Sequence, residues 1–232
     1  MTRLTIAVLV PLLASLAAAG QATPRATGFG PRVTNPWFPL AAGTTFVYRG
    51  SRDGKAARDI VTVTTKTTTI DGVRCATVRD RLFLNGRLRE RTTDWYAQDT
   101  RGNVWYFGEA TAELNATGAV TSTEGSWRAG TRGAHAGIVM PARPAVGQRG
   151  RQEYLSGHAE DHFQILSLAA RVRTPAVRSR HALLTKEWTP LEPGVVDHKL
   201  YVRRVGLVQE QTVRGGSELM ILVQVRRGRN AR

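Results

Sequence analysis

DWYAQDTRGNVWYFGE, residues 94–109, is the stretch that decides the fold class of this chain of 232 residues. Two aromatic-rich runs lie on either side of the turn segment 100–103, TRGN. Large alternating side chains around a Gly-Asn turn are typical of a β-hairpin. The stretch also holds Asp94, Asp99 and Glu109, so it forms either a half-buried sheet or the wall of a pocket.

Strand patterns continue on both sides of this hairpin. Asp71-Gly72 and Asn85-Gly86 separate three runs rich in β-branched and apolar residues, and these dipeptides favour tight hairpin turns. We therefore predict an all-β, mainly antiparallel fold with a curved sheet, of half-barrel or sandwich-like form. At most one short helix is expected after the N-terminal segment, and residues 160–170, which also fit a strand, are its candidate.

The segment 125–150 has a different composition. It holds six glycines together with Pro141 and Pro144. This composition cannot make a long regular element, so we predict a long ordered loop that acts as a lid or rim of the sheet.

The N-terminus has the layout of a secretory signal peptide. Arg3 precedes an uncharged apolar core that ends near Leu16, and small residues follow at positions 17–19. We predict a signal peptide over residues 1–22, cleaved near residues 19–22, and one secreted or periplasmic β domain over residues 23–232. The apolar core is too short for a transmembrane helix, and no cysteine follows it that could carry a bacterial lipid anchor.

The composition limits the choice of partners. The formal net charge is +15, and only 4 of the 33 basic residues are lysine. This excess is either a bias of composition or the cause of a weak attraction to anionic membrane surfaces; no fold motif accompanies it that would indicate specific nucleic-acid binding. The single cysteine, Cys75, is expected to be a buried small apolar residue. No cofactor is predicted, and the sequence does not indicate the oligomeric state.

Several blocks resemble a family of uncharacterised bacterial secreted proteins. They include VTNPWFPLAAGTTFVYRG (33–50), the 94–109 block and TKEWTPLEPGVV (185–196). The segment 201–210 also resembles periplasmic proteins whose curved antiparallel sheet, of half-barrel type, holds lipid or lipoprotein chains. This second resemblance implies a concave sheet with an apolar face. Neither resemblance supplies catalytic residues.

The densest group of potential metal ligands is HAEDH, residues 158–162. On a helix, its two histidines are four residues apart and share a face; on a strand, Glu160 shares a face with both. A metal site would need a further ligand from elsewhere in the chain. Solvated loop residues are the alternative reading. The candidate ligands are His158, Glu160, Asp161, His162 and His198.

Aromatic and acidic residues suggest two other kinds of site. The aromatic side chains could line a ligand pocket or could be core. The candidates are Trp95, Tyr96, Trp105, Tyr106, Trp127 and Trp188. Acidic residues could supply a carboxyl pair for hydrolysis, although carboxylates beside arginines are usually surface pairs. The candidates are Glu153, Glu160, Asp161, Glu187 and Glu192.

The sequence therefore predicts a non-enzymatic exported protein that binds an apolar or amphipathic small molecule in a curved sheet. The first alternative is a metal- or carboxylate-dependent hydrolase, with carbohydrate as a candidate substrate, that uses residues 151–162 with Glu187 and His198. The second is an envelope protein that binds other proteins or anionic surfaces.

Overall fold

The computed structural model describes residues 27–228, so the predicted signal peptide lies outside the described residues. This part of the chain is built from β-strands and turns, and the helix candidate 160–170 forms no helix, since residues 162–170 belong to a strand. Within it, no helix has the length and apolar character needed to cross a membrane. The strands are β1 (Phe29–Gly30), β2 (Thr45–Arg52), β3 (Lys55–Ile70), β4 (Val73–Leu84), β5 (Arg87–Asp99), β6 (Val104–Leu114), β7 (Val120–Ser122), β8 (Trp127–Arg128), β9 (His135–Met140), β10 (Arg149–Arg151), β11 (Glu153–Tyr154), β12 (His162–Arg173), β13 (Arg178–Trp188), β14 (Val196–Val202), β15 (Gly206–Arg214) and β16 (Leu219–Arg226).

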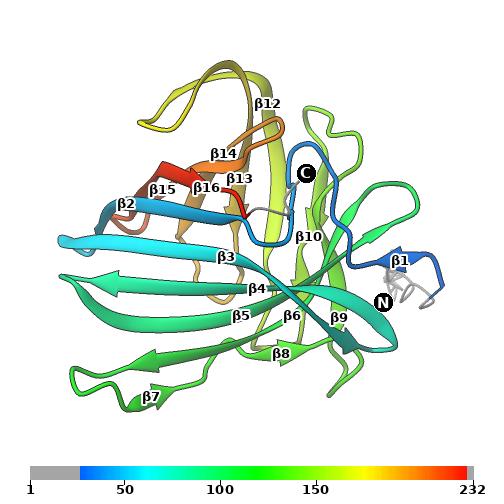
Figure 1. Cartoon of the computed structure of the whole chain (residues 1–232), viewed down its shortest axis with the longest axis horizontal. Coiled ribbons are helices and arrows are strands. Elements are labelled where there is room, and N and C mark those ends of the chain that lie inside the picture. The colour runs from blue at the N-terminus through cyan, green and yellow to red at the C-terminus, as the bar shows by residue number, and fades with distance from the viewer. Residues whose placement is uncertain (1–26, 229–232) are drawn as a thin grey trace, which may run out of the picture.

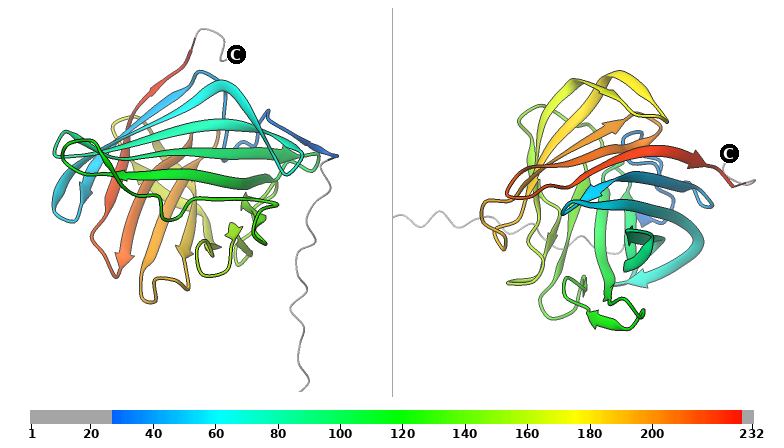
Figure 2. Two further views of the ribbon diagram at one scale, coloured as in Figure 1. Left: turned by 90° about the horizontal axis from the view of Figure 1, so that it is seen from below. Right: turned by 90° about the vertical axis from the view of Figure 1, so that its left-hand side faces the viewer.

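These strands form one antiparallel sheet that curves into a nearly closed, barrel-like shape, which confirms the predicted fold class. In Figure 1, β3, β4 and β5 run across the front of the molecule, whereas β12 runs from top to bottom behind them. Figure 2 shows the same sheet wrapping from β12 (yellow) through β16 (red) and β2 (blue) to β6 (green). The order of hydrogen-bonded strands is β10, β12, β13, β14, β15, β16, β2, β3, β4, β5, β6, β9 and β11.

The chain itself closes this sheet. β10 and β11 stand at opposite ends of the strand order, yet only Gln152 separates them in sequence. β10 pairs with β12, and β11 pairs with β9. Gly137 on β9 permits the backbone of residues 151–152 to approach β9 closely, since a Cβ atom at Gly137 would lie 2.4 Å from the Arg151 carbonyl oxygen.

Two-residue turns set the register of the front strands. Asp71-Gly72 and Asn85-Gly86 join β3 to β4 and β4 to β5, as predicted, and all four residues have positive φ. Asp53-Gly54 makes the same kind of turn between β2 and β3. Turns with positive φ at both positions match the twist of paired strands, so Asp or Asn followed by Gly fits all three.

Strict alternation then separates two faces. On β4, Val78 and Leu82 are buried and Asp80 is half-buried, whereas Arg79 and Arg81 between them are exposed. Successive residues of a strand point to opposite faces of the sheet. Val78, Asp80 and Leu82 therefore face the interior, while Arg79 and Arg81 face solvent. Cys75 is fully buried on the same strand, as expected.

The segment 33–40, VTNPWFPL, covers one end of the sheet. Asn35 fixes it, because its Nδ2 donates hydrogen bonds to the carbonyl oxygens of Gly102 (2.9 Å) and Pro141 (3.0 Å). Trp37 beside it is buried. The glycine-rich segment 125–150, predicted as one long loop, instead contributes β8, β9 and the start of β10 to the sheet.

Candidate functional site

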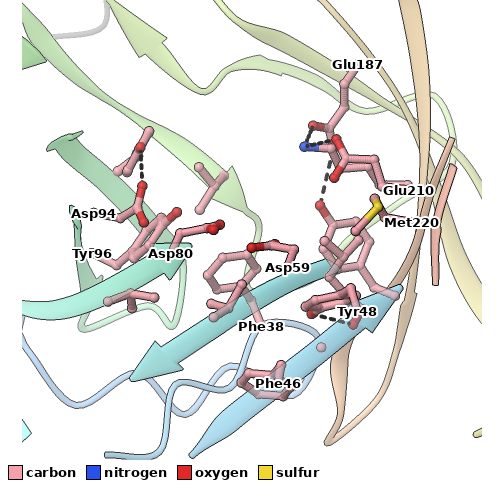
Figure 3. Close-up of a pocket in the computed structure, with 18 of the residues that line it drawn as sticks. Phe38, Phe46, Tyr48, Asp59, Asp80, Asp94, Tyr96, Glu187, Glu210 and Met220 are labelled. Atoms are coloured by element: carbon pink, nitrogen blue, oxygen red, sulfur yellow. Dashed lines mark hydrogen bonds and ion pairs between the residues drawn. The ribbon is translucent and has the colours of Figure 1, made fainter. Parts of the chain in front are cut away.

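A cavity of about 510 Å³ lies inside the curved sheet. Its apolar lining comes from segment 33–40 and from strands β2, β3, β4, β15 and β16. Members of this lining include Phe38, Phe46, Val61, Leu82, Leu207 and Met220. Figure 3 shows Phe38, Phe46 and Met220 around the same space as several carboxylates. A volume of this size is within the range of about 300–1,000 Å³ that is usual for small-molecule sites.

The cavity gathers most of the acidic residues of the protein. Of the 18 Asp and Glu residues in the chain, 11 line it. Of the 33 basic residues, 29 lie within residues 27–228, and only Arg52 and Lys199 line the cavity. A basic protein therefore has an acidic interior. The acidic lining residues are Asp59, Asp80, Glu90, Asp94, Glu109, Glu153, Asp161, Glu187, Asp197, Glu210 and Glu218.

One side of the cavity supplies its own cation. Lys199 Nζ on β14 lies 3.1 Å from Glu187 Oε2 on β13 and 3.2 Å from Glu210 Oε1 on β15. Glu187 Oε1 also accepts hydrogen bonds from the hydroxyls of Thr185 (2.8 Å) and Tyr201 (3.3 Å). We call Glu187, Lys199 and Glu210 the paired wall. Burial opposes the charge on Lys199, but the two glutamates hold its pKa well above the ordinary value.

The opposite side has no such cation. Asp59 on β3, Asp80 on β4, Asp94 on β5 and Glu109 on β6 form what we call the open wall, and none of them makes an ion pair with a side chain of residues 27–228. Asp94 and Glu109 lie directly opposite each other in the β5–β6 register. Figure 3 shows Asp59, Asp80 and Asp94 turned toward the same space.

Asp59 and Asp80 lie close enough to share a proton. Burial raises the pKa of both, and the neighbouring Asp59 carboxylate further raises the pKa of Asp80, well above its ordinary value. Two adjacent carboxylates in a poorly solvated site cannot both ionise readily. Asp59 Oδ1 is buried and has no hydrogen-bond partner in the described part of the chain.

Asp94 and Glu109 hold protons for the same reason. Burial raises the pKa of Asp94 to about 7, although the hydrogen bond from the Tyr106 hydroxyl (2.7 Å) opposes this shift. Burial, followed by the charges of Asp94 and Glu153, raises the pKa of Glu109 to about 9. At neutral pH a proton therefore neutralises Glu109 and part of the Asp94 population, whereas Lys199 neutralises the paired wall.

Other carboxylates extend the acidic lining. Glu153 Oε2 accepts a hydrogen bond from Trp127 Nε1 (2.7 Å), and burial raises the pKa of this glutamate to about 8. Arg52 forms ion pairs of 3.7 Å with Glu90 and 3.3 Å with Glu218. Each cation of the lining is thus shared between two glutamates.

Aromatic rings separate the walls. The rings of Tyr96 and Tyr106 stack with centroids 4.8 Å apart, and Phe38 packs against Tyr96 at 5.3 Å and against Tyr201 at 6.4 Å. Stacked electron-rich rings beside carboxylates favour a cationic or weakly polar group over an anionic one.

Of the six aromatic residues predicted to bind ligand, Tyr96 and Tyr106 line the cavity. Trp95 and Trp127 are buried in a separate apolar cluster, which Trp127 connects to the lining by its hydrogen bond to Glu153 and by edge-on packing against Tyr106 (5.5 Å). Trp105 donates its Nε1–H to Asp99 (3.0 Å), and Trp188 stacks on His162 (5.6 Å). Trp95 is placed elsewhere because strand alternation puts its neighbours Asp94 and Tyr96 on the cavity face.

The five predicted metal ligands, His158, Glu160, Asp161, His162 and His198, do not form a site. No group of three or more His, Cys, Asp or Glu side chains within residues 27–228 could hold a metal ion. His158 is exposed in a turn, Glu160 Oε1 accepts the Gly157 N–H, and His162 Nδ1 lies 2.7 Å from the Glu160 carbonyl oxygen. Only Asp161 lines the cavity.

Three of the predicted hydrolytic carboxylates, Glu153, Asp161 and Glu187, line the cavity, and Glu160 and Glu192 do not. Asp59, Asp80 and Glu90 were missed because an arginine precedes each of them in sequence. Carboxylates beside arginines are usually surface pairs, but on a strand the sequence Arg79-Asp80-Arg81 places the acid on one face and both arginines on the other. Repeated Arg-acid alternation within strand patterns was the available signal.

Comparisons with known proteins find few relatives. No protein-family model matches this chain, and no curated protein matches its sequence. A solved structure of a Bacteroides fragilis protein, provisionally described as exported and as having a YmcC-like fold, is 12% identical, with a TM-score of 0.48 over 82% of this chain and 99% of that one. A Parabacteroides distasonis protein, provisionally described as a lipoprotein, is 11% identical, with a TM-score of 0.44 over 82% of this chain and 98% of that one. At these scores the likenesses imply nothing about a ligand or a partner of this chain.

Proposed function

We propose that this chain is an exported, non-enzymatic binding protein that holds an amphipathic small molecule inside its curved sheet. The observation that carries the proposal is the cavity of about 510 Å³, in which Phe38, Phe46 and Met220 face a lining of carboxylates. Ligand sites combine apolar surface with a few polar groups that fix orientation, and this cavity has both. The signal-peptide pattern of residues 1–22 supports export.

Native mass spectrometry of the protein purified from an exporting host tests this function. We expect an organic excess mass that disappears on denaturation. Leu207→Trp, which places a larger ring in the cavity lining, should abolish the excess mass. Val213→Trp, on the same strand but 45% exposed, is the matched control and should retain it. A bare mass for the wild-type protein after incubation with host lipid extract would contradict the proposal.

A carboxyl-dependent hydrolase is the second candidate, and the neighbouring carboxyl groups of Asp59 and Asp80, both with a raised pKa, favour it. Acid–base hydrolysis uses one protonated and one ionised carboxyl group, and burial beside a second carboxylate produces that pair. Chromogenic glycosides, assayed from acidic to neutral pH, test this function. Turnover that is lost in both Asp59→Asn and Asp80→Asn, but kept in Glu124→Gln, would favour hydrolysis over simple binding.

We also infer that the exterior is attracted weakly to anionic surfaces. Of the 29 described basic residues, 27 lie outside the cavity lining, so the exterior is strongly basic. Binding to phosphatidylglycerol vesicles should exceed binding to phosphatidylcholine vesicles and should fall as salt is added. Equal binding to both kinds of vesicle would remove this inference.

A further inference from the structure

We propose that the ligand is a cationic amphiphile, whose ammonium or guanidinium group lies against Asp59, Asp80 and Asp94 while its apolar part contacts Phe38, Phe46 and Met220. This inference rests on the proposed binding function and adds the charge of the ligand.

The first step concerns the cations of the cavity. An anionic amphiphile such as a fatty acid would need a free cation in the lining. Lys199 lies within 3.2 Å of both Glu187 and Glu210, and Arg52 is shared between Glu90 and Glu218. A carboxylate ligand would therefore compete with two glutamates for either cation and would face further acidic groups. Burying such unpaired charge is costly.

The second step concerns Asp94. Its side chain is buried, with 9% of its surface exposed, yet it lines the cavity. Its one hydrogen bond to another side chain of the described residues joins Oδ1 to the Tyr106 hydroxyl, so the carboxyl group has no cationic partner. A buried carboxylate without a cation is stabilised when a ligand supplies one.

The third step concerns the rings beside Asp94. Tyr96 and Tyr106 form a stacked pair in the lining, and aromatic faces attract ammonium and guanidinium groups. Asp59 Oδ1 also lacks a partner in residues 27–228, which leaves a second buried acceptor on the same wall. Carboxylates and aromatic faces converge there, as recognition of an organic cation requires.

The fourth step concerns the apolar end. Phe38 reaches the cavity from the covering segment, and Phe46 and Met220 come from neighbouring strands β2 and β16. Figure 3 shows Phe38 beside Asp59 of the open wall and Met220 beside Glu210 of the paired wall. An amine that carries a hydrocarbon chain could therefore place its charge and its chain in one continuous cavity.

Isothermal titration with three octyl compounds tests the inference, because octylammonium, octanol and octanoate share a chain and differ in charge. We expect octylammonium to bind about tenfold or more tightly than octanol, and octanoate to bind most weakly. Asp94→Asn should weaken octylammonium by about tenfold while leaving octanol unchanged. Glu124→Gln, whose site is exposed and outside the lining, is the matched control and should change neither affinity.

The outcomes separate the two proposals. Equal affinities for octylammonium and octanol, or an Asp94→Asn variant that binds octylammonium like wild type, would overturn the cationic-ligand inference alone, provided that native mass spectrometry still shows an organic ligand. Failure of all three compounds to bind, together with a bare native mass, would overturn both. Phe38→Ala should weaken octylammonium and octanol alike, because it removes apolar contact and not charge.

Discussion

The two walls of the cavity neutralise buried carboxylates in different ways. On the paired wall, Lys199 lies between Glu187 and Glu210, so both glutamates are compensated within the protein. On the open wall, burial raises the pKa of Asp80, Asp94 and Glu109, so these groups bind protons more readily than ordinary carboxylates do. A lysine tethered to its strand is a permanent part of the structure, whereas a proton can be replaced by another cation. The paired wall therefore carries its own cation, whereas the open wall is where we propose that a ligand supplies one.

The largest effect is expected from removing the cation of the paired wall. Lys199→Met would leave Glu187 and Glu210 without their partner, and breaking such a buried pair costs about 3 kcal/mol or more. Guanidinium unfolding should show a lower midpoint, and the free energy of unfolding derived from it should fall by that amount. Lys186→Met, on the adjacent strand, removes a cation that lies over Trp188 and not in the cavity, and it is the control. Equal midpoints for wild type and Lys199→Met would show that the paired wall does not stabilise the fold.

A smaller effect of opposite sign is expected on the open wall. The pKa of Glu109 is raised from 4.5 to about 9, so the folded protein retains this proton at pH values where the unfolded chain has lost it. Glu109 is protonated in both states below its unfolded pKa and contributes no pH dependence there; between the two values, stability falls as the pH rises. Glu109→Gln removes this loss and should stabilise the protein by about 1–2 kcal/mol at mildly alkaline pH, or roughly 2–8 °C in Tm.

Thermal unfolding of Glu109→Gln and wild type over a pH series checks this expectation. The two curves should converge at acidic pH and separate as the pH rises. Glu113→Gln, on the same strand but outside the cavity lining, should follow wild type throughout. A Glu109→Gln variant that is less stable than wild type at alkaline pH would show that the glutamate has a compensating cation.

The hydrogen bond within the open wall should contribute less. Tyr106→Phe removes the hydroxyl that donates to Asp94 (2.7 Å), and a typical hydrogen bond contributes about 1 kcal/mol. This bond stabilises the ionised form of Asp94, whose pKa is about 7, so the cost should be larger above that pH than below it. Urea unfolding on either side of neutrality measures the difference. A cost that does not change with pH would mean that Asp94 has the same charge at both values.

The smallest effect is expected from Arg52. Its side chain is 40% exposed, and its ion pairs with Glu90 and Glu218 are longer than those of Lys199. Partly exposed ion pairs contribute about 0–1 kcal/mol, so Arg52→Gln should shift Tm by no more than a few degrees. A loss of stability as large as that of Lys199→Met would show that the ion pairs of Arg52 stabilise the fold as much as the paired wall does.

The fold was more accessible from sequence than the site. Asp71-Gly72 and Asn85-Gly86 predict hairpins because these residue types readily adopt the positive φ that tight turns need, and both turns form as predicted. The 94–109 hairpin also forms, and its Asp94 and Glu109 do lie on a pocket wall. Glu210 and Lys199 had no such local signal, because they meet only through strand pairing. The pairing of Asp59 with Leu82 on β4 likewise has no local signal, because an irregularity between Val63 and Thr67 shifts the register that the Asp71-Gly72 turn begins.

The sequence by itself determined the strands, the tight turns and the antiparallel class, since these follow from local backbone preference and alternation. Only the tertiary structure decided that the sheet closes through Gln152, that segment 33–40 covers one end, and that most of the acidic residues face one cavity. The physical reason is that alternation assigns each side chain to one of two faces but does not say which face is enclosed. Closure of the sheet determines which face is enclosed. Carboxylates that the sequence suggests are solvated therefore line a candidate binding site.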